Sequence, residues 1–434
     1  MNITTPFFIL AISYLITTVV SSNIICNVIL NCGAIADNVT LADEAITSCV
    51  KRCNTIIFPS NTTFSIASID ISNTNGLSLL FHEGSSLIAT TNKSAYPLTP
   101  FYPPMGKTMC YRAPLFGRNV SNFLISGPTS AIIDGQGAFW QPDRPTDPNQ
   151  APKLFELVDV INATVIGMTF LNSANWHVHF LWCNNVSFIN NTVLGSRIFG
   201  GTDGIDPSSC SNVLIENAYI DVGDDAIAVT AGGLHDITNL PMPTTNVLVR
   251  NSYLRSRNFA IGSATYSNVT NVIVENTRIG DEFGSASWAI KIKQHYPNGG
   301  IVSDCLFRNL TFGKITNNTY QQPNGGYALA IYSNYGILDK SYIKEEEDSS
   351  SPSPFSLSHI GNITFQDIKG LSTRWAANPL TGVPNGSALG PIHFINVDFG
   401  TVSETIPWVC TDDIIGTTIK EGLSPPIPKG KCGT

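Results

Sequence analysis

The chain has 434 residues, a formal net charge of −8 and only 13% charged residues. This length is enough for one large domain or two medium ones. The low charge content excludes a disordered acidic chain and a nucleic-acid-binding protein that relies on a basic surface. Any anionic ligand must therefore be held by a few local cations.

An apolar run from Pro6 to Val20 opens the chain and ends in small residues. This pattern is typical of a secretory signal peptide, so we expect residues 1–22 to be removed and residues 23–434 to form one domain. No Lys or Arg precedes the run, which leaves a membrane anchor as the alternative, but the run is short for a span of about 20 residues. The predicted protein is secreted, extracellular or bound in the cell wall, and free of the membrane after cleavage.

Ten cysteines, an even number, also favour an oxidising compartment. No spacing recommends a zinc site, because the Cys49-x-x-x-Cys53 pair lacks a second pair nearby. We therefore expect disulfides; the sequence leaves their connectivity open, although Cys410 and Cys432 are placed to tie down the C-terminal tail. Sequons that predict N-glycosylation lie at Asn38, Asn61, Asn92, Asn119, Asn162, Asn185, Asn190, Asn268, Asn309, Asn317, Asn362 and Asn385.

A short helix is predicted near the N-terminus. Thr40-Leu-Ala-Asp43, followed by EAITSCV, has the form of a capping box, in which the first and fourth residues cap each other's backbone N–H groups. A helix at this place would cover the open end of a repeat structure, because terminal repeats need a cap.

One phrase recurs through the middle of the chain: an Asn, a short alternating apolar run, and then an Asn or a small residue. Copies start at Asn162, Asn185, Asn212, Asn246 and Asn271, in steps of 23, 27, 34 and 25 residues. Periods of this size indicate a solenoid. The alternation within each copy has a period of two residues, so the copies are predicted to be strands.

Each copy is too short to bury a core alone, but stacked coils would bury Val, Ile and Leu in one interior. A repeated Asn at each corner can form a side-chain ladder along the stack. We therefore predict an all-β fold, a single-stranded parallel β-helix with a short N-terminal capping helix. A β-sandwich is the alternative, but its strands would alternate in direction and would not need the same Asn phrase once per coil.

Two aspartate-rich turns are spaced by about one coil: GGTDGIDPSS contains Asp203, and VGDDAIAV, 21 residues on, contains Asp224 and Asp225. Residues one coil apart lie above one another, about 4.8 Å apart, so the three carboxylates should share one surface patch. They cannot all ionise freely, and one pKa should rise. A raised acid beside an ionised carboxylate can cleave an acetal. A calcium site or solvated turn acids are the alternatives.

Lys291 and Lys293 lie on the same face of an apolar strand by alternation. Two lysines that point together from such a strand are costly unless they meet an anion. Beside the acids, they are predicted to hold a negatively charged substrate. Two solvated lysines on a sheet edge are the alternative.

These motifs resemble glycoside hydrolase family 28, the polygalacturonases and related enzymes that cut pectin. The family's Asn-Thr-Asp, Asp-Asp and Arg-Ile-Lys signatures correspond to residues 201–203, 224–225 and 291–293, in the same order. IDGQGAFW at 133–140 and SANWHVHF at 173–180 are similar to two further family segments. The resemblance covers most of the mature chain.

The resemblance implies a right-handed parallel β-helix that hydrolyses glycosidic bonds with inversion, without a metal or another cofactor. It implies that Asp224 is the general acid and that Asp203 and Asp225 orient and deprotonate the attacking water. Lys293 would bind a uronate carboxylate, with Lys291 in the place of the usual Arg. The expected partner is a galacturonan-type pectic polysaccharide, either polygalacturonate or a related rhamno- or xylogalacturonan. The protein is expected to be a monomer without a nucleic-acid partner.

Several positions depart from the family pattern. Gly201 replaces the Asn of the first signature, and Lys291 gives up the bidentate fork of Arg. Residues 258–264 contain no counterpart of the family's Gly-His-Gly histidine, and Ala264 replaces the Glu of a Gly-Ser-Glu branch. The acids are retained while the substrate-holding groups differ, which suggests an altered substrate or weak activity.

Two further side chains are candidates for substrate binding. His177 lies a coil before Asp203 and is a candidate for the missing histidine, with burial in the coil of Trp176 as the alternative. Tyr296, close after Lys293, is a candidate for stacking on a sugar ring, with simple packing as the alternative.

Two other functions compete with glycoside hydrolysis. A pectate lyase shares the solenoid, but it needs calcium and a base for a C5 proton, and no strong Arg candidate is found near the acids. A solenoid without activity that binds polysaccharide is the third possibility. Retention of Asp203, Asp224 and Asp225 together argues against it.

Overall fold

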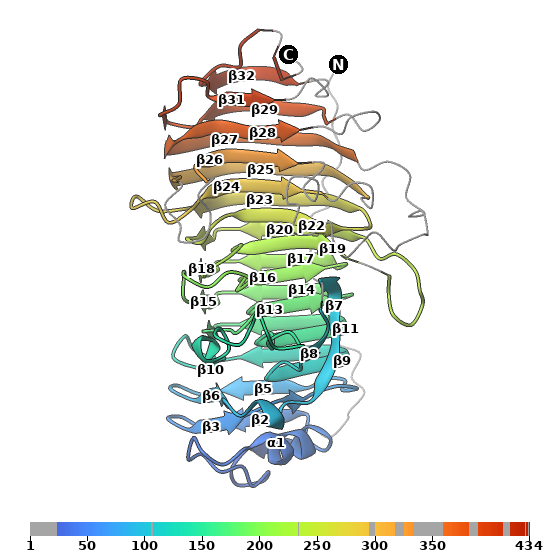
Figure 1. The fold of residues 1–434 in the computed structure, drawn as a ribbon. Helices are drawn as coiled ribbons and strands as arrows, with labels where there is room; N and C mark the ends of the chain where they lie inside the picture. Colours follow the sequence, from blue (N-terminus) through green and yellow to red (C-terminus); the bar gives the residue numbers. More distant parts are fainter. Residues whose placement is uncertain are drawn as a thin grey trace.

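The computed structural model describes residues 24–105, 107–232, 234–294, 300–316, 325–332, 359–381, 389–410, 417–429, 431–432 and 434. Within these ranges, 30 strands form one continuous sheet that winds into the predicted right-handed parallel β-helix (Figure 1). All strand pairs in this sheet are parallel; an antiparallel hairpin, β7 (Leu98–Met105) and β8 (Lys107–Tyr111), stands apart from it. The parallel pairing excludes the β-sandwich. The predicted signal peptide lies outside the described residues.

The β-helix has three faces, because each coil contributes up to three strands. Face 1 contains β4 (Ile69–Asp70), the first parts of β9 (Leu115–Ser126) and β11 (Phe155–Ile166), β13 (Val178–Leu181), β16 (Ile205–Ser208), β19 (Ile227–Ala231), β22 (Phe259–Thr265), β24 (Trp288–Lys293), β26 (Tyr327–Tyr332), β28 (Trp375–Thr381) and β31 (Trp408–Cys410).

Face 2 continues through β9 and β11 and also contains β1 (Ile25–Asn27), β2 (Thr55–Phe58), β5 (Ser78–Phe81), β14 (Asn184–Ile189), β17 (Ser211–Glu216), β20 (Thr244–Arg250), β23 (Val269–Ile279), β25 (Ile301–Lys314), β27 (His359–Thr373), β29 (Ile392–Asp398) and β32 (Thr418–Ser424). The shorter strands of face 3 are β3 (Thr63–Ile66), β6 (Ser86–Ala89), β10 (Ile132–Asp134), β12 (Thr169–Leu171), β15 (Thr192–Leu194), β18 (Tyr219–Asp221), β21 (Tyr253–Leu254) and β30 (Thr401–Val402). Two 3-10 turns, η1 (Lys93–Ala95) and η2 (Gly137–Phe139), lie between strands.

The core follows from the alternation within each strand. Every second side chain points inward and stacks on its equivalent in the next coil, as Val213 does on Val247. Aromatic rings continue this pattern, with the ring of Phe365 5.3 Å from that of Phe307 and 5.4 Å from that of Phe394. Each such side chain contributes about 1.5–3 kcal/mol of burial free energy, so the stack compensates for the weakness of any single coil.

The predicted asparagine ladder is present at the corner where face 2 begins. The Asn246 Nδ2 donates to Asn212 Oδ1 over 2.9 Å, and the Asn271 Nδ2 donates to Asn246 Oδ1 over 2.7 Å. The same corner residues have left-handed backbone angles, with φ of 58° at Asn246 and 60° at Asn185. Asn suits this corner for two reasons, because it tolerates that backbone region and also supplies both the donor and the acceptor of the ladder.

The N-terminal helix forms, but not through the predicted capping box. Helix α1 spans Asp43–Val50, and its N-cap is Ala42, which makes no side-chain cap. The Asp43 carboxylate instead accepts hydrogen bonds from the N–H groups of Ala67 (2.8 Å) and Ser68 (2.5 Å) in the next coil. The tertiary contact has therefore replaced the local cap, and it docks the helix on the open end of the solenoid.

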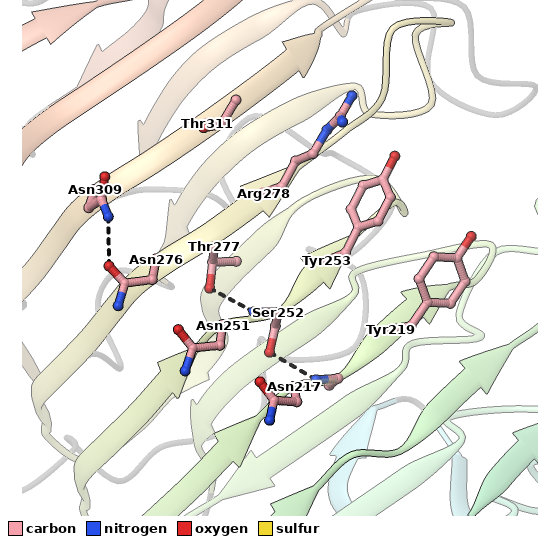
Figure 2. Close-up of a pocket in the computed structure, with 11 residues that line it drawn as sticks. Asn217, Tyr219, Asn251, Ser252, Tyr253, Asn276, Thr277, Arg278, Asn309 and Thr311 are labelled. Atoms are coloured by element: carbon pink, nitrogen blue, oxygen red, sulfur yellow. Dashed lines mark hydrogen bonds between the residues drawn. The ribbon is translucent and has the colours of Figure 1, made fainter. Parts of the chain in front are cut away.

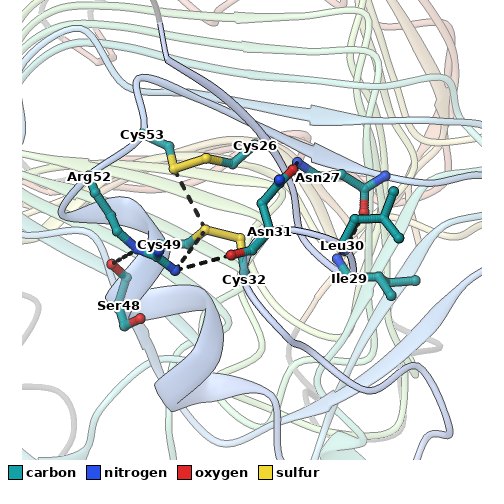
Figure 3. Close-up of a disulfide and its surroundings, with 10 residues drawn as sticks. All are labelled: Cys26, Asn27, Ile29, Leu30, Asn31, Cys32, Ser48, Cys49, Arg52 and Cys53. Carbon is teal, nitrogen blue, oxygen red and sulfur yellow. Dashed lines mark hydrogen bonds between the residues drawn. A yellow bond between two sulfur atoms is a disulfide. The ribbon is translucent and has the colours of Figure 1, made fainter.

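Disulfides close both ends of the described chain. Cys26–Cys53 and Cys32–Cys49 attach α1 to the first strands (Figure 3), and Cys410–Cys432 fixes the C-terminal tail as predicted. The remaining cysteines are buried free thiols at Cys110, Cys183, Cys210 and Cys305. Among the described residues, no helix has the length and apolar character needed to cross a membrane.

Candidate active site

The three predicted acids lie on turns that lead into face 1. Asp203 comes shortly before β16, and Asp224 and Asp225 come shortly before β19. One carboxylate oxygen of each residue lies within 4.8 Å of the others. Coil stacking thus brings together side chains that are distant along the chain.

The register of the stack places Asp203 level with Asp225 rather than with Asp224. Ile205 pairs with Ile227 across the two coils, so the coil step is one residue longer than the spacing that the sequence suggested. Asp224 consequently lies toward the solvent, with 20% of its side chain exposed against 4% for Asp225.

Asp224 is held by an arginine that sequence reasoning missed. Arg257 Nη1 lies 2.8 Å from Asp224 Oδ1, and the Gly201 N–H donates to Asp224 Oδ2 over 2.5 Å. Arg257 is itself buried, so water screens this ion pair only weakly. Both contacts stabilise the ionised carboxylate.

Asp225 is also held in its charged form. Lys293 Nζ lies 2.8 Å from Asp225 Oδ2, and the Asn258 Nδ2 donates to Asp225 Oδ1 over 2.9 Å. Burial alone would raise the pKa of Asp225, but the charges of Lys293 and Lys291 and the two hydrogen bonds outweigh it and lower this pKa below its ordinary value.

Asp203 is in the opposite situation. Its carboxylate is buried, and no side chain among the described residues donates a hydrogen bond to it. Burial, together with the charges of Asp224, Asp206 and Asp225, raises the pKa of Asp203 well above its ordinary value. The site therefore combines a carboxyl group with a raised pKa, that of Asp203, and one with a lowered pKa, that of Asp225.

The two lysines stand on the outer side of β24, as alternation predicts, while Ile290 and Ile292, which alternate with them, are fully buried. Lys291 Nζ lies 4.1 Å from the centre of the Trp288 ring, which is a cation–π contact. Burial and the neighbouring charge of Lys293 lower the pKa of Lys291 to about 7. An anion that binds here would favour the charged form of Lys291.

His177 does not join the cluster. Its ring is fully buried, with Nδ1 2.9 Å from the Asp203 carbonyl oxygen and Nε2 3.1 Å from that of Leu194. Burial lowers the pKa of His177 to about 4. The structure thus gives no support to the predicted substrate contact of His177. Its ring instead connects neighbouring segments of the backbone through their carbonyl oxygens. Tyr296 lies outside the described residues.

A buried polar row continues face 1 on one side of the acids. Glu156, His179 and Asp206 stand in register on the outer side of three successive strands. His179 Nδ1 lies 2.8 Å from Glu156 Oε1, and Lys153 Nζ lies 2.5 Å from the same oxygen. These outward-pointing side chains are nevertheless buried, because the β7–β8 hairpin covers them, with the Tyr102 carbonyl 3.1 Å from Lys153 Nζ.

One departure from the family pattern has a structural reason. Gly201 adopts a φ of 63°, and a side chain there would collide with the guanidinium of Arg144. Arg257 and Asn258 were not predicted because 33 residues separate Asn258 from Asp225 in the sequence. The loop after β19 lengthens this coil, so the spacing gives no sign that the two residues are neighbours.

A groove of about 620 Å³ lies elsewhere, on the corner between faces 2 and 3 (Figure 2). Tyr219 and Tyr253 are in register on its wall, and the guanidinium of Arg278 lies 5.1 Å from the centre of the Tyr253 ring. The described residues that line it include no Asp, Glu or His. The groove therefore offers no acid or base for catalysis.

A right-handed parallel β-helix with three carboxyl groups gathered on one face is the arrangement expected of a glycoside hydrolase. The chain belongs to the glycosyl hydrolases family 28, whose family model matches residues 35–324. This finding confirms the resemblance that the motifs indicated.

Individual relatives are distant. A probable polygalacturonase of Vitis vinifera is 27% identical over 83% of this chain and 69% of its own length. An endo-polygalacturonase of Pectobacterium carotovorum is 24% identical over 58% of this chain and 64% of its own. Among solved structures, an exopolygalacturonase of Thermotoga maritima has a TM-score of 0.67 at 18% identity, covering 89% of this chain and 91% of that one. At this identity the structural match supports the fold alone.

Proposed function

We propose that the protein is a secreted hydrolase that cleaves galacturonan-type bonds of pectic polysaccharides with inversion. The observation that carries this proposal is the mixed ionisation of carboxyl groups that lie within 4.8 Å of one another. Acetal hydrolysis needs both states, because one group protonates the leaving oxygen while another deprotonates water. The carboxyl groups of the predicted cluster can therefore supply both the proton donor and the base.

The substrate class follows from the cations beside the acids. Lys291 is buried against Trp288 and gains its full charge most readily when an anion arrives. A uronate carboxylate is an anion attached to a sugar, and the names of the grapevine and bacterial relatives support a galacturonate polymer.

The hairpin favours attack at the end of a polymer chain. It covers face 1 on the side of the acids where Glu156 and His179 are buried. Phe101 and Tyr102 of β7 contact Trp176 and Trp182, with ring centres 5.5 and 5.3 Å apart. A polysaccharide that lies along face 1 would meet this wall, so it would have to present a terminus to the acids.

A calcium-dependent lyase fits the site less well. Calcium takes 6–8 oxygen ligands, whereas the carboxylates of Asp224 and Asp225 are already paired with Arg257 and Lys293. The lyase also needs a base for a carbon-bound proton, and the charges of Lys293 and Lys291, which lower the pKa of Asp225, weaken that carboxylate as such a base.

The deciding experiment measures reducing ends released from polygalacturonate, rhamnogalacturonan and xylogalacturonan, with and without EDTA. We expect release that survives EDTA, mainly of short products with a slow fall in viscosity. An unsaturated product absorbing in the ultraviolet would instead identify a lyase. Retention on immobilised pectin without any release would identify a binding protein.

Inversion needs its own measurement. Inverting enzymes hold a water between carboxyl groups that are typically about 6.5–9.5 Å apart, and the nearest oxygens here are within 4.8 Å. Proton NMR of the first product anomer distinguishes the two outcomes. The opposite anomer to that of the substrate supports inversion, and the same anomer would replace it with a retaining mechanism.

A further inference from the structure

Two rows of side chains form the groove of Figure 2, and successive coils contribute one residue to each row. The first row consists of Asn217, Asn251, Asn276 and Asn309. The second row consists, in register, of Tyr219, Tyr253, Arg278 and Thr311. The steps between these coils, at about 4.8 Å each, make the groove about 14 Å long. Its volume of about 620 Å³ falls in the range of sites that bind organic ligands.

An N-glycosylation sequon lies at each end of the groove. Asn309-Leu310-Thr311 closes one end, and both its Asn and its Thr line the groove. At the other end, Asn190 and Thr192 of a second sequon continue the two rows by one coil, with the Asn217 Nδ2 donating to Asn190 Oδ1 over 3.0 Å. In the coils between them, Tyr or Arg stands where a sequon has Thr. The two sequons thus bracket the tyrosines of the groove.

We infer that N-glycans on Asn190 and Asn309 lie in this groove, which binds the neutral, N-acetylhexosamine-containing oligosaccharide that the chain itself carries. The inference rests on the secretion that is part of the proposed function, because the sugar donor, a lipid diphosphate oligosaccharide, belongs to the secretory route. The Asn Nδ2 forms a bond to the anomeric carbon of the donor and releases one proton. The bond from that carbon to the phosphate oxygen breaks, and its electron pair leaves with the diphosphate.

The lining of the groove suits a neutral sugar. Tyr219 and Tyr253 are partly exposed, with ring centres 5.5 Å apart, and such rings offer an apolar face to the C–H groups of a sugar and a hydroxyl to its oxygens. The asparagine amides supply both donors and acceptors. Arg278 is paired with Glu282 over 2.7 Å, so its charge is already matched. A uronate therefore gains less from this groove than a neutral sugar does.

The asparagine ladder is compatible with a glycan on its donor atom. Asn309 is exposed, and its Nδ2 donates to Asn276 Oδ1 over 2.7 Å. Glycosylation replaces one of the two hydrogens of Nδ2 and leaves the other to donate. Asn190 and Asn309 have similar left-handed backbone angles, with φ of 57° and 50°. Both side chains therefore leave the corner of the solenoid in the same way, one at each end of the groove.

The first experiment measures glycan occupancy and exposure in protein secreted from a eukaryotic host. Mass spectrometry of glycopeptides should find Asn190 and Asn309 modified. An endoglycosidase that cuts the glycan core should act several-fold more slowly at both sites in the folded protein than in the unfolded chain. Tyr253→Ala should speed release from the folded protein several-fold, whereas the control Tyr102→Ala, in the β7–β8 hairpin, should not.

Three results would overturn the inference. A secreted protein that lacks a glycan at either site would show that the groove is not filled in this way, although secretion itself would stand. A protein that stays in the cell without any glycan would overturn the proposed secretion as well. Equal release from Tyr253→Ala and the parent would show that the glycan extends into solvent. None of these measurements uses hydrolysis of pectin, so a failure of the proposed activity is recognised separately.

The second experiment separates the glycan from the side chain that carries it. Thr311→Val abolishes the sequon but keeps Asn309 and its ladder hydrogen bond, and Thr311→Ser keeps the sequon. In secreted protein, we expect Thr311→Val to lower the melting temperature by a few degrees and Thr311→Ser to leave it unchanged. In protein made in a bacterial host without N-glycosylation, neither variant should differ from the parent. An equal loss for Thr311→Val in both hosts would show that the threonine rather than the glycan is responsible.

Discussion

The candidate active site and the groove of Figure 2 are built from the same coils, yet their charges are arranged differently. Beside the groove, charges are matched one to one, with Arg250 2.9 Å from Glu216 and Arg278 2.7 Å from Glu282. At the site, three carboxyl groups lie within 4.8 Å of one another, and their ion pairs include those of Arg257 with Asp224 and of Lys293 with Asp225.

Burial explains why the charges at the site have a larger effect than those beside the groove. The arginines beside the groove are partly exposed, and water screens their interactions. At the site, Asp203, Asp206 and Asp225 are buried, so unmatched charge there is costly. Stacking alone therefore brings side chains together, and only burial gives them unusual chemistry.

The largest effect is expected on activity from Asp224→Asn, which removes one of the three clustered carboxyl groups without changing its shape. Acid–base groups typically contribute about 10²–10⁴-fold to a rate, so kcat should fall by that factor. The variant should still fold, but with a lower melting temperature, because the buried Arg257 loses its charged partner. Asp221→Asn, on face 3 of the same coil, is the control and should retain activity. Equal activity of both variants would remove Asp224 from the reaction.

Lys293→Met should cause the largest loss of stability. It leaves the buried Asp225 carboxylate without its cation, and breaking a buried pair in this way typically costs about 3–5 kcal/mol. Because the folded pKa of Asp225 is lowered, the contribution of the pair is present at neutral pH and is lost as the pH falls through that pKa. Urea unfolding at pH 7 and at low pH measures both features. A loss that is the same at both values would show that packing rather than charge is responsible.

Asn246→Val tests the asparagine ladder at the corner of the coils from which the active site and the groove are both built. Val disfavours the left-handed backbone by about 1–2 kcal/mol, and two ladder hydrogen bonds, each contributing about 0.5–1.5 kcal/mol, are also lost. We expect a destabilisation of about 2–5 kcal/mol in urea unfolding. Asn246→Gly keeps the backbone angle and loses only the ladder, so it should cost less. If the two variants unfold alike, the backbone angle is not a reason for Asn at this corner.

Asp203→Asn should stabilise the protein at neutral pH. A carboxyl group whose folded pKa is raised contributes its full stability below its ordinary pKa and loses it as the pH rises through the folded value. The amide avoids this loss, so the gain in melting temperature should be absent near pH 3 and should grow toward pH 8. A variant that is less stable than the parent at every pH would mean that Asp203 is ionised and paired.

Much of this architecture is contained in local sequence. The Asn phrases and the alternation of apolar residues predict the strands, their parallel stacking and the ladder. The two aspartate turns predict the cluster, because about one coil separates them along the chain. Asp43 shows where local reasoning fails, since its carboxylate caps Ala67 and Ser68 of another coil rather than its own helix.

The rest of the site depends on loops whose length the repeat does not determine. Arg257 reaches Asp224 only because the long loop after β19 leaves the next coil in register. The buried His177 shows the converse: alternation places it correctly, but whether an outward position is covered depends on the hairpin and turns above it. The pKa shifts of the site depend on this burial, and they cannot be predicted from a sequence motif.

The smallest effect is expected for Arg308→Gln in the matched row of face 2. Arg308 pairs with Glu275 of the preceding coil and is 41% exposed, so it resembles the site's ion pairs in geometry but not in burial. Exposed pairs of this kind typically contribute about 0–1 kcal/mol, and 0.5 M salt should reduce the difference further. Urea unfolding of Arg308→Gln beside Lys293→Met compares one ion pair in each environment. If the two variants lose similar stability, burial does not distinguish the site from face 2. The raised pKa of Asp203 would then need a cause other than burial.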